Sequence, residues 1–445
     1  MSAEIAAVRL LEILDSRGQP TLQVELTLDQ GTRVVAGVPS GTTTGSAEAI
    51  ERRDGDQHRF AGRGLVEVAE QAGHWLTEAL GGQRLNRAED QIALDQRLHE
   101  VDSTRRFVRL GGNVAVGISV AACRAIAAVT AVPEWQVVHE LTSTLGDSRS
   151  QVAPRLPVPH FTMISGAAGP SDLPFQDFMI APLGAPSLTE AVRAGAEIYQ
   201  RLRALLTAAN LPVGVAEEGG FILTDARPDQ ALQLMVDAIS EAGYEPGPHG
   251  VALALDVAAS RFRFGPEYIL DEQPVSSNAM IDYLEDLVER FPIWSVEDGL
   301  AENDWDGWLL LKHRLGARIQ LVGDDIFVTD GDLIQRGIDR GWANAAVIKL
   351  NQVGTVSQSV TAASTCAGAG WGAMVAHRSG ETTDPFIADL AVGLGCGQFK
   401  AGAPARGERV AKYNRLLEIA VTGAVADWGL PDGFRSLRTL EGFRS

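Results

Sequence analysis

Charged residues stand at the ends of five short apolar runs in the second half of the chain. The runs are VALALD, PIWSVED, RIQLVGDD, AAVIKL and GAMVAHRSG, and the charged residues that end them are Asp256, Glu297, Asp324, Lys349 and His377. Successive charged residues are 25 to 41 positions apart, which leaves room for one strand, one helix and two loops. This alternation predicts parallel βα units that close into a barrel. Because the carboxyl ends of barrel strands converge on one mouth, the five side chains should face one another there.

Three of these side chains are carboxylates, which repel one another unless a cation lies between them. A set of oxygen ligands without Cys or His suits Mg²⁺ rather than Zn²⁺. We therefore predict Asp256, Glu297 and Asp324 as the ligands of a magnesium ion. A solvated strand end or a helix N-cap explains any one of them alone equally well, but the serial pattern favours the metal site.

Lys349 follows the fourth apolar run and is expected to lie beside the metal. Burial and a nearby cation both lower the pKa of an ammonium group, so we predict that Lys349 supplies a neutral amine as a general base. The alternative is a lysine that only pairs with a carboxylate. The neighbouring Asp298 and Asp325 are expected to support the site or to cap a helix.

The first part of the chain has a different pattern. Apolar and polar residues alternate from 21 to 28, a turn is predicted at 29–31, and a second strand-like run covers 33–38. Between 65 and 132 the apolar spacing becomes helical. Residues 141–159 are rich in Ser, Gly and Pro, as is typical of a domain boundary. The predicted fold is therefore α/β, with an N-terminal α+β capping domain over residues 1–140 and a barrel over residues 141–445.

The composition restricts the partners that we expect. The chain has 38 Lys and Arg against 57 Asp and Glu, a net charge of −19, so polyanions such as nucleic acids and acidic membranes are repelled. The most apolar stretch, 114–132, carries Ser119 and Arg124 near its middle and is predicted to be a buried helix rather than a membrane span. Three separated cysteines and an N-terminus without a signal-like apolar core predict a cytoplasmic protein without disulfides.

Long motifs occur in order over nearly the whole chain. They are LDSRGQPTLQVEL, VPSGTTTGS, ERRDGD, AEEGG, ALDVAAS, SVEDGL, LVGDDIFVT, IKLNQVGT, HRSGETTD and GQFKAGAPARGERVAKYN. Together they resemble the enolase family, the phosphopyruvate hydratases. The resemblance implies an enolase-type (β/α)₈ barrel and a hydro-lyase that uses two Mg²⁺ ions in each active site, one structural or conformational and one catalytic.

The resemblance also implies roles for individual residues. Lys349 would remove the α-proton of the substrate, and Glu218 would protonate the departing β-hydroxyl. The alternative for Glu217 and Glu218 is an exposed acidic turn. Lys400 would contact the substrate carboxylate. The other substrate-binding positions implied by the family motifs are Gln176, His377, Arg378 and Ser379.

The chain departs from the family pattern at several places. Thr43 stands where the family has a serine that ligates the second Mg²⁺ ion, and the catalytic position of a family glutamate is occupied by Asp177. The segment ISGAAGPSDLPFQDF is one residue shorter than in the family and lacks a histidine that reaches the phosphate; His160, in an apparent strand, is expected to be structural. Near the C-terminus, LLEIAVTG replaces an acidic residue that pairs across the family dimer with the arginine at Arg17.

Two functions remain open from the sequence. The first is a Mg²⁺-dependent lyase that converts a 2-phosphoglycerate-type acid into a phosphoenolpyruvate-type product; the altered loop favours a modified substrate, as in carboxyphosphonoenolpyruvate synthesis. The second is a non-catalytic enolase relative with a binding or structural role. The retained charges favour the lyase, since a scaffold has no need for mutually repelling groups. The expected partners are a small phosphorylated or phosphonylated carboxylic acid and further copies of the chain, as a dimer or a larger homo-oligomer.

Overall fold

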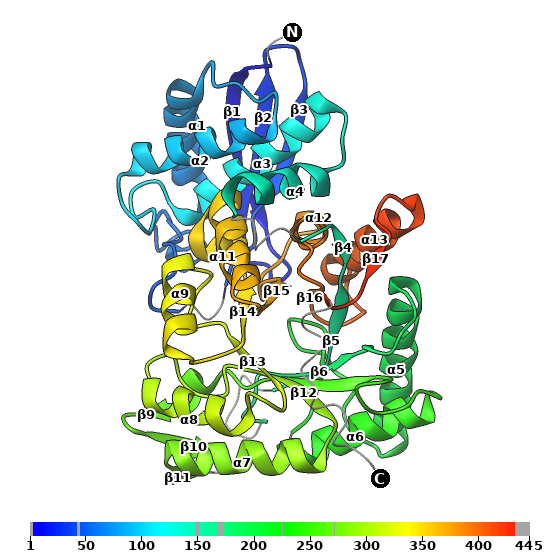
Figure 1. The fold of residues 1–445 in the computed structure, drawn as a ribbon. Helices are drawn as coiled ribbons and strands as arrows, with labels where there is room; N and C mark the ends of the chain where they lie inside the picture. Colours follow the sequence, from blue (N-terminus) through cyan, green and yellow to red (C-terminus); the bar gives the residue numbers. More distant parts are fainter. Residues whose placement is uncertain are drawn as a thin grey trace.

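The computed structural model describes residues 3–41, 45–146, 152–166, 173–224, 226–270 and 272–431. Its first part is a three-stranded antiparallel sheet followed by helices (Figure 1). The strands are β1 (Ile5–Leu14), β2 (Pro20–Leu28) and β3 (Arg33–Gly37), and the helical segments are η1 (Phe60–Gly62), α1 (Val66–Leu80), α2 (Ala88–Asp102), α3 (Gly112–Thr130) and α4 (Glu134–Leu145). The predicted hairpin is confirmed as β2 and β3, which pair antiparallel.

Strand β1 was not predicted, and it pairs with β2 so that β2 becomes the central strand. Its sequence, IAAVRLLEIL, does not alternate between apolar and polar residues, and its exposure is correspondingly irregular. Periodicity alone therefore gives no strand signal here. Helix α1 packs against β1, and α3 packs against β2 and β3, so the sheet is covered by helices.

Helix α3 covers the apolar stretch 114–132 of the sequence except for its last two residues. Among the described residues it is the one helix long and apolar enough to cross a membrane, but 83% of its apolar window is buried inside the protein. It packs closely on the sheet: a Cβ atom added to Gly117 would lie 2.4 Å from the side chain of Val24. Helix α3 is thus the central helix of the N-terminal core, in agreement with the sequence prediction.

Eight strands in the second part form a closed barrel, because β16 pairs with β5 at the end of the strand order. They are β5 (Val158–Ser165), β6 (Asp177–Ala181), β8 (Ala252–Asp256), β12 (Ile293–Glu297), β13 (Gln320–Gly323), β14 (Ala345–Ile348), β15 (Gly372–Ala376) and β16 (Gln398–Lys400). The five strands predicted from charged run ends are confirmed as β8 and β12 to β15. The short pairs β4 (Arg155–Leu156) with β17 (Asp427–Trp428), β7 (Phe221–Ile222) with β5, and the sheet β9 (Arg263–Phe264), β10 (Glu267–Leu270), β11 (Gln273–Val275) lie outside this ring.

The barrel differs from the predicted all-parallel arrangement at β6, which runs antiparallel to both β5 and β8. The connection from β5 to β6 covers only residues 166–176, too few for the helix that a parallel return needs. The chain therefore turns straight back. As a result the first residue of β6, rather than its last, lies at the mouth of the barrel.

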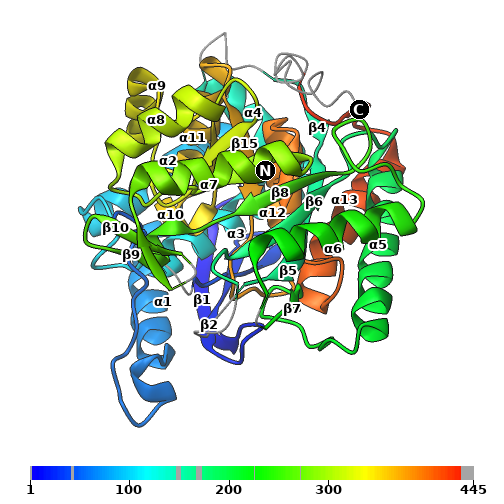
Figure 2. The same ribbon diagram turned by 90° about the horizontal axis from the view of Figure 1, so that it is seen from below.

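Helices lie outside the ring of strands, as the view from below shows (Figure 2). They are α5 (Leu188–Ala208), α6 (Pro228–Glu241), α7 (Ser277–Arg290), α8 (Trp305–Leu315), α9 (Gly331–Arg340), α10 (Leu350–Val353), α11 (Val356–Gly368), α12 (Phe386–Leu394) and α13 (Gly407–Thr422), with η2 (Ala259–Phe262) after β8. Many begin at a side chain that accepts a hydrogen bond from the first turn, which satisfies an otherwise free backbone N–H group. These N-cap residues are Ser187, Ser276, Asp304, Asp330 and Thr355.

The two parts of the chain meet at the barrel mouth. Ser40 and Gly380 exchange two backbone hydrogen bonds of 2.8 and 2.9 Å, and Ala49 N donates to Gln352 O at 2.7 Å. The segment after β3 is thereby held against the ends of β14 and β15. Helix α4 extends to Leu145, so the boundary predicted at residue 140 falls within this helix.

Candidate active site

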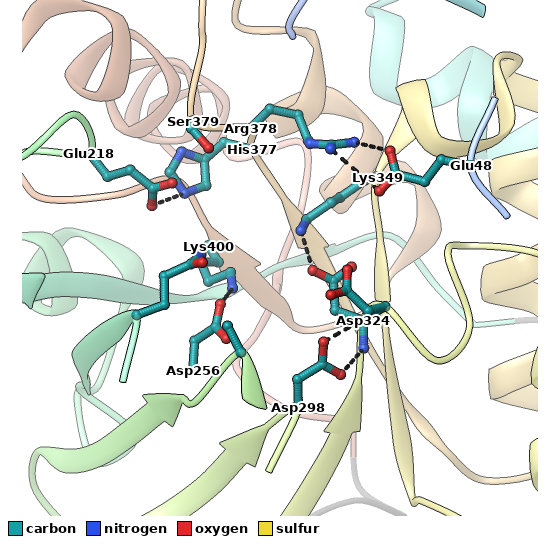
Figure 3. A pocket seen from close by; sticks show the side chains of 13 residues that line it. Glu48, Glu218, Asp256, Asp298, Asp324, Lys349, His377, Arg378, Ser379 and Lys400 are labelled. Carbon is teal, nitrogen blue, oxygen red and sulfur yellow. Dashed lines mark hydrogen bonds and ion pairs between the residues drawn. The ribbon is translucent and has the colours of Figure 1, made fainter. Parts of the chain in front are cut away.

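A pocket at the barrel mouth gathers most of the predicted site residues (Figure 3). It is lined by Glu48, Gln176, Glu218, Asp256, Ala258, Asp298, Asp324, Asp325, Lys349, His377, Arg378, Ser379 and Lys400. Nine of the twelve predicted positions are in this set. Asp177 and Glu297 lie next to the pocket without lining it, and Thr43 lies outside the described residues.

Strand register brings these side chains to one level. Glu297, the last residue of β12, is opposite Asp256, the last residue of β8. On the other side of Asp256 lies Asp177, the first residue of antiparallel β6. Lys400 ends β16 opposite Ala376, the last residue of β15. The expected convergence of strand ends on one mouth is therefore confirmed for these strands.

Lys400 is the centre of a buried charged group. Its Nζ lies 3.1 Å from Asp256 Oδ2 and 2.7 Å from both carboxylate oxygens of Glu297. Burial and the charge of Asp256 raise the pKa of Glu297 to about 8. Burial by itself would lower the pKa of Lys400, but the attraction of Asp256 and Glu297 outweighs it and raises that pKa well above its usual value.

Lys349 pairs with Asp324 on the other side of the pocket. The sequence predicted a lowered pKa for Lys349, but the pKa is raised, because the attraction of Asp324 outweighs the effect of burial. Burial would raise the pKa of Asp324, yet the charges of Lys349 and Lys400 lower it. The lowered pKa was predicted for a lysine beside a bound cation, so it stays a prediction; in the structure described here the partner of the ammonium is the Asp324 carboxylate.

Asp298, Asp324 and Asp325 form a group of carboxylates whose ligand atoms lie within 4.8 Å of one another. Asp298 accepts backbone hydrogen bonds of 2.8 and 2.9 Å from the N–H groups of Asp324 and Asp325, so it holds the turn after β13, as expected of a supporting residue. Burial and the charge of Asp325 raise the pKa of Asp298 well above its usual value, and burial with the charge of Asp324 raises that of Asp325 to about 7. The raised pKa values reflect an excess of negative charge in this group of carboxylates. Carboxylate oxygens are ligands that suit a hard divalent cation.

His377 links an acid to a buried arginine. Its Nε2 lies 3.1 Å from Glu218 Oε2, and its Nδ1 lies 2.5 Å from Nη1 of Arg409. Burial lowers the pKa of His377 to about 4, so the imidazole is neutral near pH 7. Because an arginine can only donate, Nδ1 must accept, and the ring proton is on Nε2, where it is donated to Glu218.

Glu218 is held as a carboxylate by this arrangement. Burial alone would raise its pKa, but His377 and the charges of Arg409 and Lys400 lower it well below its usual value. Arg409 is fully buried and also donates to the backbone oxygens of Arg378 at 2.7 Å and Ser379 at 2.5 Å. It was not singled out from the sequence, although its motif GERVAKYN was among those that resemble the family.

Arg378 forms an ion pair with Glu48, a residue of the pocket lining that was not predicted from the sequence. Arg378 Nη1 lies 2.9 Å from Glu48 Oε2 and 2.9 Å from Asn351 Oδ1. The only sequence signal for Glu48 was its place between two family-like motifs, VPSGTTTGS and ERRDGD. The Arg378 guanidinium also packs against the backbone of Gly41, which follows β3: a Cβ atom added to Gly41 would lie 2.0 Å from Arg378 Nη2.

Asp177 and Gln176 lie where the β5–β6 connection enters the barrel. Ser165 Oγ donates to Asp177 Oδ1 at 3.1 Å, while Oδ2 is buried without a hydrogen-bond partner in the described part of the chain. Burial and the charges of Glu218 and Asp256 raise the pKa of Asp177 well above its usual value. Gln176 lines the pocket directly.

Two further residues from the sequence analysis lie away from the pocket lining. His160 is buried on β5 opposite Lys400, with its ring 5.5 Å from that of Trp294. Arg17 pairs with Asp15 of the same chain at 2.8 Å and donates to Ser40 O. The contact predicted to be altered across a dimer remains a prediction, because the structure describes one chain.

Comparisons with known proteins agree with the fold. Residues 5–138 match the family model described as the enolase N-terminal domain, and residues 153–428 match the enolase C-terminal TIM barrel domain. A protein named Enolase from Acidothermus cellulolyticus (strain ATCC 43068 / DSM 8971 / 11B) is 45% identical over 418 residues, which cover 94% of each chain. With both domains matched and this degree of identity, the chain belongs to the enolase family and is a lyase of the phosphopyruvate hydratase type.

Proposed function

We propose that this lyase depends on Mg²⁺ and removes water from a 2-phosphoglycerate-type acid to give a phosphoenolpyruvate-type product. One observation carries the proposal: a lysine and a carboxylate, Lys349 and Glu218, enter the pocket from different sides, with the acidic strand ends between them (Figure 3). Elimination needs a base at one carbon of the substrate and an acid at the next. The pocket has a candidate for each.

The metal ligands that we propose are Asp256, Glu297 and Asp324, with Thr43 at a second ion. Support comes from the excess of buried carboxylates, since Glu297 has a pKa raised to about 8 even with Lys400 beside it. All of these donors are oxygen atoms, as Mg²⁺ prefers. When bound, Mg²⁺ ions would offset the second negative charge that develops on the substrate carboxylate as its α-proton leaves.

Each proton transfer of the reaction is assigned to a different residue. Lys349, as a neutral amine, accepts the α-proton. Glu218 is a carboxylate in the free site, so it first takes up a proton and then passes that proton to the departing β-hydroxyl. A C–H and a C–O bond are thereby exchanged for one C=C bond and water. His377 donates to Glu218 and fixes its orientation. Asp177, whose raised pKa favours the protonated form, lies beside Glu218 and would assist on this side.

The remaining cationic and hydrogen-bonding side chains of the pocket would bind the anionic groups of the substrate. Lys400 is proposed to bind the substrate carboxylate, and Arg378, Ser379 and Gln176 the phosphorus-containing group. The β5–β6 connection supplies no histidine to this group, which favours a modified phosphoglycerate, including one that leads to carboxyphosphonoenolpyruvate. We further propose that the protein acts in the cytoplasm as a homo-oligomer.

Exchange of the substrate α-proton with D₂O tests this proposal directly. Proton NMR should show Mg²⁺-dependent exchange by the wild type, loss of exchange by at least about a hundredfold in Lys349→Ala, and retained exchange without elimination in Glu218→Gln, because base and acid act on different bonds. Excess chelator should stop both steps in the wild type. Wild-type exchange rates in Lys349→Ala, or full turnover in chelator, would contradict the proposal.

A further inference from the structure

A second cavity lies between the N-terminal domain and the barrel. Its volume is about 440 Å³, and its lining comes from within the segments 47–49 and 105–106 of the first domain and 328–336 and 352–358 of the barrel. Sites for small molecules have volumes in this range and often occur at domain interfaces. Among the described residues, none of the site residues predicted from the sequence lines this interdomain cavity. The proposed reaction therefore gives it no role.

Arginines give the interdomain cavity an excess of positive charge. Three guanidinium groups line it, against the two carboxylates of Asp330 and Asp332. Both carboxylates pair with Arg105, at 2.7 and 2.9 Å. Arg106 donates through Nε to a backbone oxygen at 2.6 Å, and the Arg336 side chain has no hydrogen-bond or ion-pair partner in the part of the chain that the structure describes. In a chain with a net charge of −19, two guanidinium groups without a carboxylate partner at one cavity favour an anionic ligand.

The wall of the interdomain cavity also contains apolar side chains, those of Val328, Leu333 and Val353. Val328 is buried, and its φ of 45° lies in the left-handed region that β-branched residues rarely adopt. A 2.7 Å hydrogen bond from Val328 N to Asp324 O holds this conformation. The wall is thus fixed before a ligand binds, which lowers the cost of binding. Apolar walls with a few charged groups suit an organic ligand better than a bare inorganic ion.

Gln352 separates the interdomain cavity from the active pocket. It lines the cavity, and its Nε2 donates to Glu48 Oε1 at 3.2 Å and to Asp324 Oδ1 at 3.0 Å, two residues that line the pocket. Arg106 donates to the backbone oxygen of the same Glu48, whose carboxylate pairs with Arg378 (Figure 3). A ligand in the cavity would therefore lie one residue away from the pocket without entering it.

We propose that the interdomain cavity binds a small organic anion. The guanidinium groups of Arg106 and Arg336 bind its phosphate or carboxylate group, which a planar fork of N–H donors matches. Val328 and Leu333 contact its carbon skeleton. The site is separate from the active pocket, since neither the proposed base nor the proposed acid lines it. The proposal goes beyond the proposed function and does not depend on it.

Titration calorimetry with phenyl phosphate tests the proposal on the full chain. This probe joins one phosphate group to a small apolar ring. The wild type should bind it at least about tenfold more tightly than inorganic phosphate, because the ring is buried against the apolar wall. Arg336→Ala should weaken binding of phenyl phosphate by about ten- to a hundredfold, since one charge-assisted contact is lost. Arg336→Lys should restore only part of the affinity, because an ammonium lacks the planar fork.

Arg340 provides the matched control. It is exposed on the same helix, α9, four residues beyond Arg336, and does not line the interdomain cavity. Arg340→Ala makes the same change in net charge and should leave the affinity for phenyl phosphate within about twofold of the wild type. Equal affinity in Arg336→Ala and the wild type would place the probe elsewhere and overturn the proposal. Absence of binding to the wild type at millimolar phenyl phosphate, or equally tight binding of inorganic phosphate, would also overturn it.

Discussion

His160 shows how burial can decide the protonation state of a side chain. It is fully buried on β5 against Trp294, and burial lowers its pKa to about 3 from 6.5. The neutral ring is therefore favoured in the folded protein. Its contribution to the free energy of unfolding is complete above pH 6.5 and is lost as the pH falls toward 3, because the unfolded chain binds the proton first.

We expect His160→Gln to reduce the acid sensitivity of the protein. Between pH 7 and pH 5, the loss in free energy of unfolding should be smaller than in the wild type by about 2 kcal/mol, from about 1.4 kcal/mol per pH unit below pH 6.5. Urea unfolding at the two pH values measures this difference. His74→Gln, which removes an exposed imidazole from α1, is the control. Equal acid sensitivity in His160→Gln and the wild type would contradict the assignment.

At the scale of one element, strand β6 depends on two glycines at its opposite ends. At the mouth, Gly166 N donates to Gln176 O at 2.8 Å, and a Cβ atom on Gly166 would lie 1.7 Å from Phe175 O. At the other end, a Cβ atom on Gly184 would lie 1.8 Å from His249 O. Both contacts are with backbone, which cannot move aside as a long side chain can.

These two positions separate effects on activity from effects on stability. Gly166→Ala and Gly184→Ala should each lower the free energy of unfolding, by about 1 to 3 kcal/mol for overpacking. Gly166→Ala should also lower kcat by about tenfold or more, because it displaces the segment that carries Gln176 and Asp177. Gly184→Ala should keep kcat near the wild-type value. Steady-state kinetics together with urea unfolding decide this, and equal kcat in the two variants would show that the turn does not position the site.

At the scale of the whole molecule, a largely buried ion pair between Arg124 and Asp384 joins the N-terminal domain to the barrel away from the pocket, where Arg378 and Glu48 form another such pair. Arg124, on α3, donates to both carboxylate oxygens of Asp384 at 2.6 and 2.7 Å, and Asp384 follows β15. Asp384 also accepts from Gly37 N at 2.7 Å. Burial would raise the pKa of Asp384, but Arg124 lowers it below its usual value. A carboxylate from the barrel is thus held between two elements of the first domain.

Arg124→Met should lower the free energy of unfolding of the whole protein rather than disturb the pocket alone. Without its cation the buried carboxylate of Asp384 is uncompensated, which costs about 3 to 5 kcal/mol in the free energy of unfolding. The exposed pair Arg97 and Glu100 gives the control, and Arg97→Met should cost less than about 1 kcal/mol. Thermal unfolding followed by circular dichroism compares the two. Similar midpoints for both variants would show that the interdomain pair contributes no more than a surface pair.

The sequence by itself determined the five barrel strands β8 and β12 to β15 and the charged residues that end them. Asp256, Glu297 and Asp324 were found because a parallel barrel strand is a continuous apolar run, and a charge at its end is a local signal. The helical spacing over 65–132, with the buried apolar stretch 114–132, was an equally local signal. The family-like motifs added Glu218 and Lys400, which no period or spacing marks.

Only the tertiary structure decided which groups meet and what charge they carry. The antiparallel direction of β6 follows from a short connection, and it brings Arg261 to Gln176 across the register of Asp177 and Asp256. The role of Glu48 depends on its contact with Arg378, 330 residues away in the sequence, and that of Arg409 on contacts with His377 and Ser379 from another element. The pKa of Lys349 is raised in this structure because Asp324 is its partner. Electrostatic energy depends on the distance between side chains in space. The order of residues along the chain does not give that distance.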